Sequence, residues 1–343
     1  MARHRLALAA AVSALLLACG DASPRFATVD PGACVTDFDP ELDYYPDKAD
    51  LRHARNFTLE YHQHYKILRT RSEIGGAEDV IVLNRCGTPE PALTGDLEGA
   101  LLIDTPVDAF ASTSPASALR VRLLGLEDRI AAVPANPYDS VLASLTASGR
   151  ASRITAHGEP HLEGMLVLGV DALLLWVATV EDAHGLSRAR EIGVPAIPLM
   201  SWAEPTYLGQ IEWIKHHAAL FEAESAAEAW FSDIEERYDE LRARAAGLPK
   251  IPVVWVSPDL PNQWWVEAGN WQDEALEAAG GRNVFGVDPE QGYLVVSTEQ
   301  LVRVAAEAEV FITNVPSLDA LEALLPVESL PAFATGRVFH VHG

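Results

Sequence analysis

The chain has 343 residues, 49% of them hydrophobic, and its 49 acidic and 25 basic residues give a net charge of −24. This length is sufficient for two hydrophobic cores. The acidic excess argues against nucleic acid and against an anionic membrane surface as partners. It is compatible with a basic protein surface or a cationic or metal-bearing ligand, and equally with a charge that only keeps the protein soluble.

Residues 1–18 predict an export signal. Arg3 and Arg5 precede an apolar run over 6–17, which is too short for a comfortable membrane span. The run ends in Leu-Leu-Ala-Cys, which resembles a bacterial lipobox. By that resemblance Cys19 becomes the lipid-modified first residue of the mature chain; an ordinary secretory signal is the alternative. With the lipobox, the protein is expected in the cell envelope, periplasmic or extracytoplasmic, and anchored to a membrane by acyl chains.

The next stretch, 19–50, is rich in Asp, Pro and Ala without periodicity and predicts a mobile tether. Cys34 and Cys86 are the only cysteines besides Cys19. In an exported protein these two could pair. Two free thiols are an equally good interpretation of their spacing, so the sequence leaves the disulfide open.

Residues 51–223 predict an α/β lobe that begins with a meander. Three segments of strand character, at 57–61, 65–70 and 79–84, are separated by short polar turns. Strands and helices then alternate, which predicts a parallel sheet with βαβ crossovers. The further predicted strands are 101–104, 107–112, 172–177 and 194–199, and the predicted helices are 117–124, 162–168, 187–192 and 207–221.

The segment 224–247 predicts one long helix between two lobes. Its apolar residues recur at spacings of three and four. Ser225 and Glu228 have the spacing of a capping box, and Gly247 followed by Pro249 marks the end. At about 1.5 Å per residue the helix spans roughly 33 Å. A rigid strut between lobes is therefore expected, with a surface helix of one large domain as the alternative.

Residues 248–343 predict a second α/β lobe with a mostly parallel sheet. The predicted strands are 251–256, 310–314 and 337–341, and the predicted helices are 273–279, 298–306 and 318–325. Because a parallel strand is normally followed by an element that covers its face, the sequence also predicts that this second lobe is incomplete.

Aromatic and small polar residues gather at the predicted strand ends and in the loops after them. Ligands bind beyond the carboxyl ends of the strands in open α/β sheets. Broad apolar faces with a few polar groups suit a large planar or chelated ligand. Any single Trp is as readily a core residue. The set as a whole predicts one ligand-binding opening in each lobe, at the carboxyl ends of the strands, which we call the mouth of that lobe. The candidate ligand residues are Ser112, Thr113, Trp176 and Trp202 in the first lobe, and Trp264, Trp265, Asn270, Thr313 and Asn314 in the second.

No enzymatic signature and no resident cofactor is predicted. The sequence has no Gly-rich phosphate loop, no G-x-S-x-G and no H-E-x-x-H. His62 and His64 alternate on a strand, and His216 and His217 are adjacent on a helix, where they cannot both face one ion. A metal site needs three or four ligands at suitable spacing. These histidines are therefore expected to be ordinary surface residues, and no metal ligands are predicted.

Several features together resemble a known family. They are the lipobox, the two lobes, the single connecting helix and the segment EPHLEGMLVLGVDALLLWV at 159–177. They resemble the periplasmic substrate-binding proteins of iron-siderophore and cobalamin ABC importers. The blocks PTYLGQIEWIKHHAALF, VSPDLPNQWWVEAGN and GGRNVF are similar to one branch associated with iron-complex uptake. The resemblance covers roughly residues 55–343, although the family's second lobe continues with further helix after its last strand.

The resemblance implies a lipid-anchored receptor rather than an enzyme. It would capture an iron-siderophore, haem-like or corrinoid complex between the lobes and deliver it to an ABC permease and its ATPase. In that family an acid on each lobe docks a permease arginine pocket, and the matching positions are Glu163 and Glu299. Both begin predicted helices, where the dipole favours a carboxylate, so a purely helix-stabilising role is the alternative. A receptor for bare Zn or Mn and a chelatase-like or nitrogenase-like enzyme remain as rival functions.

Overall fold

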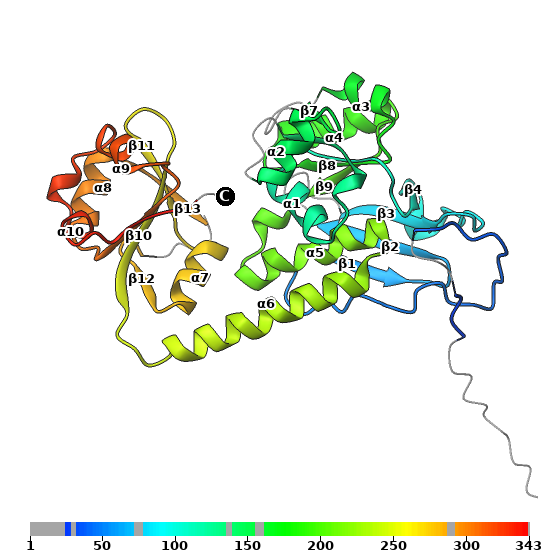
Figure 1. Ribbon diagram of the computed structural model, residues 1–343, viewed down its shortest axis with the longest axis horizontal. Helices are drawn as coiled ribbons and strands as arrows, with labels where there is room; N and C mark the ends of the chain where they lie inside the picture. The colour runs from blue at the N-terminus through cyan, green and yellow to red at the C-terminus, as the bar shows by residue number, and fades with distance from the viewer. Residues whose placement is uncertain are drawn as a thin grey trace, which may run out of the picture.

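The computed structural model describes residues 25–28, 32–71, 78–134, 139–154, 161–286 and 292–341. Two α/β lobes are joined by the long helix α6 (Glu224–Ala245), as Figure 1 shows. This confirms the predicted fold class. The export signal and Cys19 lie outside the described residues. No helix in the described part of the chain is both long and apolar enough to cross a membrane.

The first lobe begins with a four-stranded sheet in the order β1-β2-β3-β4. Strands β1 to β3 form the predicted antiparallel meander, and β4 adds to β3 in parallel. The strands are β1 (Phe57–Tyr61), β2 (Tyr65–Arg71), β3 (Glu78–Arg85) and β4 (Leu101–Thr105). Apolar residues of this sheet, among them Leu68 and Ile81, belong to the same hydrophobic cluster as the following parallel sheet. The meander is thus an integral part of the lobe.

The second sheet of this lobe is entirely parallel, in the order β7-β6-β5-β8-β9. Its strands are β5 (Phe110–Ser112), β6 (Ile130–Pro134), β7 (Ser152–Ile154), β8 (Ala172–Trp176) and β9 (Ala196–Leu199). The helices are α1 (Pro115–Leu123), α2 (Ser140–Ala147), α3 (Leu162–Leu168), α4 (Val180–Glu191) and α5 (Tyr207–Phe221), and the short 3₁₀ turns are η1 (Gly95–Leu97), η2 (Glu127–Arg129) and η3 (Ser201–Ala203). The predictions missed β6, α2 and β7, whose short segments carry weak periodicity.

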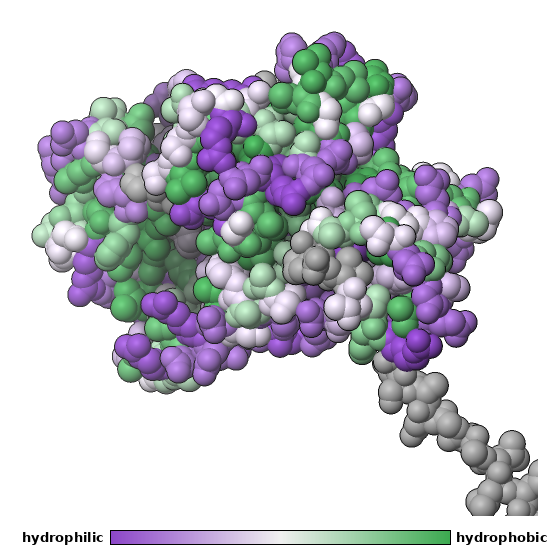
Figure 2. All heavy atoms as spheres, turned by 45° about the vertical axis from the view of Figure 1, so that its right-hand side comes forward, coloured by the Kyte–Doolittle hydropathy of each residue, from purple (hydrophilic) through white to green (hydrophobic). Residues whose placement is uncertain are grey.

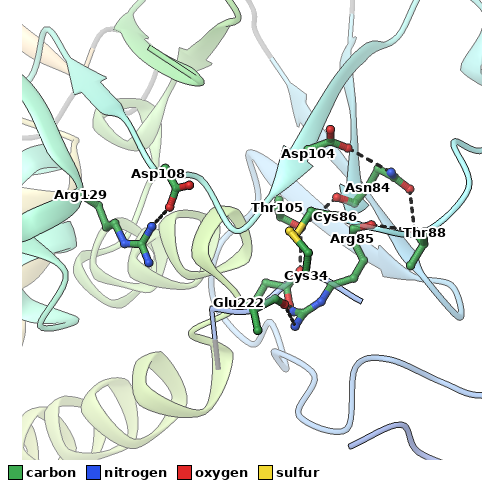
Figure 3. Close-up of a disulfide and its surroundings, with 11 residues drawn as sticks. Cys34, Asn84, Arg85, Cys86, Thr88, Asp104, Thr105, Asp108, Arg129 and Glu222 are labelled. Carbon is green, nitrogen blue, oxygen red and sulfur yellow. Dashed lines mark hydrogen bonds and ion pairs between the residues drawn. A yellow bond between two sulfur atoms is a disulfide. The ribbon is translucent and has the colours of Figure 1, made fainter. Parts of the chain in front are cut away.

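The predicted tether is wrong for residues 32–50, which pack on the first lobe. Tyr44 and Tyr45 are 5% and 3% exposed. Cys34 and Cys86 form a disulfide, which joins this segment to the end of β3 (Figure 3). The Val35 amide donates to the Cys86 carbonyl at 2.9 Å. Burial of two tyrosines and a covalent cross-link thus order a stretch whose composition alone is typical of a flexible chain.

Helices α5 and α6 follow one another almost without a break. The predicted capping box at Ser225 and Glu228 is wrong, because α6 begins at Glu224 and its N-cap, Ala223, has no side-chain acceptor. The Glu224 carboxylate instead accepts from Lys66 Nζ at 2.7 Å inside the first lobe. A tertiary ion pair therefore fixes the start of α6. The predicted end is confirmed, since Gly247 has a φ of +81° just after the helix.

The second lobe holds a six-stranded sheet ordered β13-β11-β10-β14-β15, with β12 beside β10. Its strands are β10 (Ile251–Pro258), β11 (Gln263–Glu267), β12 (Gly281–Asn283), β13 (Tyr293–Ser297), β14 (Val310–Thr313) and β15 (Val338–His340). The helices are α7 (Trp271–Ala278), α8 (Thr298–Ala305), α9 (Leu318–Glu322) and α10 (Pro331–Ala334), with η4 (Val327–Ser329) between the last two. Strands β10, β12, β14 and β15 pair in parallel, β11 is antiparallel to β10, and β13 pairs antiparallel with β11 and so runs in the direction of β10. The residues predicted as a loop after β10 therefore include a strand.

Candidate functional site

The candidate site lies where the carboxyl ends of the parallel strands meet the space between the lobes. Figure 2 shows a hollow between the two lobes, and its wall on the second lobe is largely apolar. Strands β8 and β9 are neighbours in the first-lobe sheet, as are β14 and β15 in the second. Side chains just beyond these strand ends are thus brought together within each lobe, although they are far apart in sequence.

Ser112 and Thr113 lie at the predicted place, but their hydroxyls are used within the lobe. Both residues are buried. Ser112 Oγ donates to the Leu174 carbonyl at 3.2 Å, and Thr113 Oγ1 accepts from the Trp176 amide at 2.9 Å. These two residues fasten the end of β5 to β8. They shape the loop that leads into α1 rather than presenting free hydroxyls to a ligand.

Trp176 and Trp202 stand at adjacent strand ends. Trp176 closes β8 and is half-buried, and Trp202 in η3 follows β9 with 37% of its surface exposed. The Trp202 indole Nε1 donates to the carbonyl of Val177, the residue after Trp176, at 2.9 Å. This bond sets the orientation of the exposed ring. The structure therefore brings the two predicted first-lobe tryptophans to one edge of the sheet.

The two tryptophans of β11 point to opposite faces of the second-lobe sheet. Trp264 is 2% exposed, packs in the core and donates from Nε1 to Thr298 Oγ1 at 3.0 Å. Its prediction as a ligand residue is wrong, because an alternating strand turns one of two neighbouring side chains inward. Trp265 is half-buried and stacks on Tyr293 of β13, with ring centroids 3.8 Å apart and planes 14° apart. Together these two rings form a flat aromatic surface.

The polar candidates of the second lobe also divide into structural and available groups. Asn270 caps α7 by accepting from the Gln272 and Asp273 amides. Thr313 is fully buried, and its Oγ1 accepts from the Val315 amide at 3.3 Å. Asn314 is exposed directly beyond the end of β14. Of these three residues, Asn314 is the one placed to meet a ligand.

Sequence reasoning missed a buried polar cluster beneath the first-lobe mouth. His216 and His217 are fully buried, so their prediction as surface residues is wrong. The Nδ1–H of His217 donates to the Trp213 carbonyl and Nε2 accepts from the Ser117 hydroxyl, each at 2.7 Å. Burial, reinforced by the charge of Arg120, lowers the pKa of His216 to about 3 and that of His217 well below its usual value. Both rings are therefore neutral at physiological pH.

Arg120 is the cation of this cluster. It is 6% exposed, and no carboxylate of the described residues forms an ion pair with it. Its guanidinium donates to the Gln210 carbonyl at 3.0 Å and to Ser201 Oγ at 3.5 Å, and burial lowers its pKa to about 10. Arg120 thereby connects α1, η3 and α5. Helix α5 is buried on all sides over residues 212–221, which is why both adjacent histidines lie in the interior, and no local motif indicates this.

Glu163 and Glu299 occupy corresponding places in the two lobes. Each is exposed in the first turn of a helix, α3 or α8, that leads into the strand next to the edge of its sheet, β8 or β14. Capping is performed by other side chains: His161 accepts from the Gly164 amide, and Ser297 forms a capping box with Gln300. Neither acid makes a side-chain hydrogen bond or ion pair among the described residues. Both carboxylates are thus available to a partner.

Three cavities lie away from the predicted ligand residues. One of about 330 Å³ separates the end of α6 from α7, one of about 380 Å³ is polar and includes Arg25 and Asp43, and one of about 270 Å³ lies between α7 and the apolar face of β10 and β14. No group of three or more His, Cys, Asp and Glu residues is placed to hold a metal ion in the part of the chain that the structure describes.

Comparisons with known proteins agree with this architecture. A family model described as periplasmic binding protein matches residues 111–343. An uncharacterized lipoprotein of Methanocaldococcus jannaschii is 26% identical over 168 residues, which are 45% of this chain and 42% of that relative. This chain therefore spans less than half the length of that curated relative.

Solved structures give the same fold. The periplasmic vitamin B12 binding protein BtuF of Vibrio cholerae superposes with a TM-score of 0.51 at 23% identity, over 69% of this chain and 88% of that one. The periplasmic heme binding protein HutB of the same organism superposes with a TM-score of 0.55 at 18% identity, over 68% and 90%. The family match begins within β5 and includes both mouths and the connecting helix. The chain belongs to the periplasmic binding protein family.

Proposed function

We propose that this protein is the lipid-anchored, extracytoplasmic receptor of an ABC importer, and that it captures an iron-siderophore, haem-like or corrinoid complex between its lobes. The observation that carries the proposal is the pairing of family membership with aromatic surfaces at both mouths. Two relatives of the same fold are named for binding vitamin B12 and heme, which are both large planar metal complexes.

Trp202 and Trp265 are the proposed contacts for the faces of such a complex. Trp202 is the exposed ring of the first lobe, and Trp265 lies flat on Tyr293 in the second. Flat aromatic surfaces bury much area against a planar ring system. Asn314 supplies an amide that can accept or donate a hydrogen bond at the rim. A receptor for bare Zn or Mn would require three or four converging His, Asp or Glu ligands, so these side chains favour a bulky complex.

Binding is tested by titrating the full chain with hemin, cyanocobalamin and a ferric siderophore while following tryptophan fluorescence. One of the three is expected to quench emission saturably. Trp202→Ala should weaken that binding by about 1–3 kcal/mol if the ring is a buried anchor in the complex. Trp264→Ala is the matched control, because its ring lies in the core and its loss should reduce stability. Saturable binding of Zn²⁺ or Mn²⁺, with none of the complexes bound, would contradict the proposal.

Glu163 and Glu299 are proposed to dock the receptor onto basic pockets of the permease. Two fixed anions provide register and speed the encounter with complementary charges. Helix α3 supports an interface beside Glu163, because Leu166, Val167 and Leu168 expose 45%, 88% and 37% of their surfaces. Contiguous exposed apolar side chains of this kind mark interaction sites more often than chance.

The docking role is tested by the double change Glu163→Arg, Glu299→Arg. Ligand affinity should stay unchanged, because neither acid is among the proposed ligand contacts. Transport should be abolished, because like charges would now face each other. Persistent transport in the double variant, or a parallel fall in ligand affinity, would remove the docking role and leave only the stabilisation of the helix starts.

A further inference from the structure

One carboxylate of the second lobe contacts both the first lobe and the connecting helix. Glu274 lies on α7, and its Oε2 accepts from the backbone amide of Tyr207 at 3.0 Å. Its Oε1 accepts from the phenol of Tyr238 at 2.7 Å. Tyr207 is the first residue of α5 in the first lobe, and Tyr238 belongs to α6. A single side chain therefore joins three elements that belong to the two lobes and to the helix between them.

Both hydrogen bonds that the Glu274 carboxylate accepts are of a strong type. The first amides of a helix have no acceptor within it, and the carboxylate supplies one where the helix dipole also favours negative charge. The N-cap residue Thr206 does not compete, because its hydroxyl accepts from the Gly209 amide at 3.1 Å. Burial, followed by the bond and charge of Glu274, raises the pKa of Tyr238, so its phenol remains a donor at physiological pH. Bonds to an ionised acceptor are about twice as strong as neutral ones.

Aromatic rings surround the carboxylate. The Tyr207 and Tyr238 rings lie 5.6 Å apart between centroids and nearly parallel, at 15°. Trp271, one helical turn before Glu274 on α7, lies 6.1 Å from the Tyr207 ring. All three rings are partly buried. The rings pack α7 against α5 and α6 beside the carboxylate, and Glu274, itself partly buried, also lines the cavity of about 330 Å³ between α6 and α7.

Apart from the contacts of Glu274 and these rings, the second lobe is joined to α6 by a short linker beside a cavity. The cavity of about 330 Å³ separates α7 from the last turn of α6, and its lining runs from Glu274 to Glu277 and Arg242. The chain then reaches β10 through residues 246–250, in which Gly247 takes a positive φ of +81°. Among the second-lobe elements, α7 is the one closest to α5 and α6 in Figure 1. Neither the cavity nor the short linker opposes a rotation of the second lobe as strongly as the contacts of Glu274 do.

We propose that Glu274 is an interlobe latch, a positioning residue that fixes the angle between the two lobes through Tyr207 and Tyr238. With the latch closed, the mouths of the two lobes are held at one separation. With the latch open, the second lobe rotates about residues 246–250. This inference rests on contacts within the chain and does not depend on the identity of the ligand.

The latch is tested by measuring distances between the lobes in the full chain. Spin-labelled noncanonical residues at the exposed positions Glu181 on α4 and Glu322 on α9 avoid the native cysteines. Pulsed electron–electron double resonance then reports the distribution of distances between the two labels in the absence of ligand. The unaltered chain should give one narrow peak, and Glu274→Ala should broaden it about twofold as more lobe angles become populated. Tyr238→Phe keeps the ring stack and removes one bond, so a smaller broadening is expected.

Two controls separate a latch from a merely structural residue. Glu277→Ala changes an exposed acid on the same helix, whose nearest cation is Lys250 at 3.9 Å, and should leave the peak narrow. Glu274→Gln keeps an acceptor oxygen and should restore part of the narrow distribution. An unchanged distribution in both Glu274→Ala and Tyr238→Phe would overturn the proposal, even if thermal stability fell. If Glu274→Ala fails to fold, the result for Tyr238→Phe decides.

Discussion

The two lobes are held to the connecting helix in opposite ways. The first lobe is joined to it through buried charges: Lys66 and Glu224, 0% and 4% exposed, pair at 2.7 Å at the start of α6. The second lobe is joined through the partly exposed contacts of Glu274 and a short linker. A fully buried ion pair allows little movement between the elements it joins, because any displacement leaves a buried charge without its partner. The comparison indicates that α6 and the first lobe move as one body, while the second lobe is the part that can rotate.

A buried carboxylate of α5 extends this rigid attachment to the segment before β1. Glu212 is fully buried and accepts from the backbone amides of Arg52, His53 and Ala54, the last two at 2.7 Å. Burial alone would raise the pKa of Glu212, but those three amides and Lys215 hold this pKa below its usual range. The first lobe thus adds buried ion pairs to its hydrophobic core, whereas the ion pairs of Lys250 and Arg337 in the second lobe lie at the surface.

The largest expected effect comes from breaking the buried pair. Lys66→Met should lower the free energy of unfolding by about 3–5 kcal/mol, because it leaves the Glu224 carboxylate buried without its partner. Urea unfolding followed by circular dichroism measures the change. Arg337→Ala is the matched control, since its ion pair with Glu309 is 51% and 57% exposed and should contribute under about 1 kcal/mol. Equal losses in the two variants would contradict the contrast between the lobes.

Removing the disulfide should have the next largest effect, again in the first lobe. The double change Cys34→Ser, Cys86→Ser opens a cross-link between residues 52 apart in sequence. The expected loss is about 2–4 kcal/mol, because the unfolded chain regains conformational freedom. Hydrogen exchange should show faster exchange in residues 32–50, and amides of the second lobe should exchange as before. Faster exchange throughout both lobes would argue against their independence.

Acidification should weaken the first lobe selectively. His216 and His217 are buried as neutral rings, and their folded-state pKa values are depressed, to about 3 for His216. The unfolded chain therefore binds more protons below about pH 6.5, and the stability present at neutral pH is lost as the pH falls. Lowering the pH from 7.5 to 5.5 should reduce the free energy of unfolding by about 2–3 kcal/mol through these two rings together. Chemical denaturation at several pH values tests this slope.

His216→Phe provides the control for that titration. Phenylalanine keeps a flat ring between Trp213 and Phe57, which contact His216 at centroid distances of 4.7 and 5.4 Å. Because one of the two titrating groups is gone, the variant should show about half of the pH dependence. A slope identical to that of the unaltered chain would mean that other groups cause the acid sensitivity.

The parts of the fold that could be predicted are those with strong local patterns. Residues 57–61 and 207–221 were predicted with the bounds that β1 and α5 have, because alternation and helical period are unbroken there. Strand β11 was missed because Gln263 to Glu267 lack the alternation of a half-buried strand: three apolar residues, 264–266, stand between two polar ones. The two adjacent tryptophans were interpreted as part of a ligand loop instead. Trp264 was consequently predicted as a ligand residue, and its burial in the structure shows that this prediction was wrong.

Tertiary contacts explain the remaining misses. The spacing of Ser225 and Glu228 fits a capping box, but the helix starts two residues earlier than that box implies, where Glu224 forms an ion pair with Lys66. The order of residues 32–50 depends on a disulfide to a residue that lies beyond β1 and β2 in the sequence. Glu274 carried no local signal either, because both of its partners come from other helices. Contacts over such separations cannot be inferred from spacing within one segment.

The capture of a metal complex between the lobes is tested by native mass spectrometry of the full chain, purified from its own host without added metal. We expect a folded protein that carries one non-covalent organic metal complex, released when the protein is unfolded. The mass of that complex would identify it as a siderophore, a haem-like compound or a corrinoid. A folded protein that carries only a bare Zn or Mn ion would rule out the proposed ligand class.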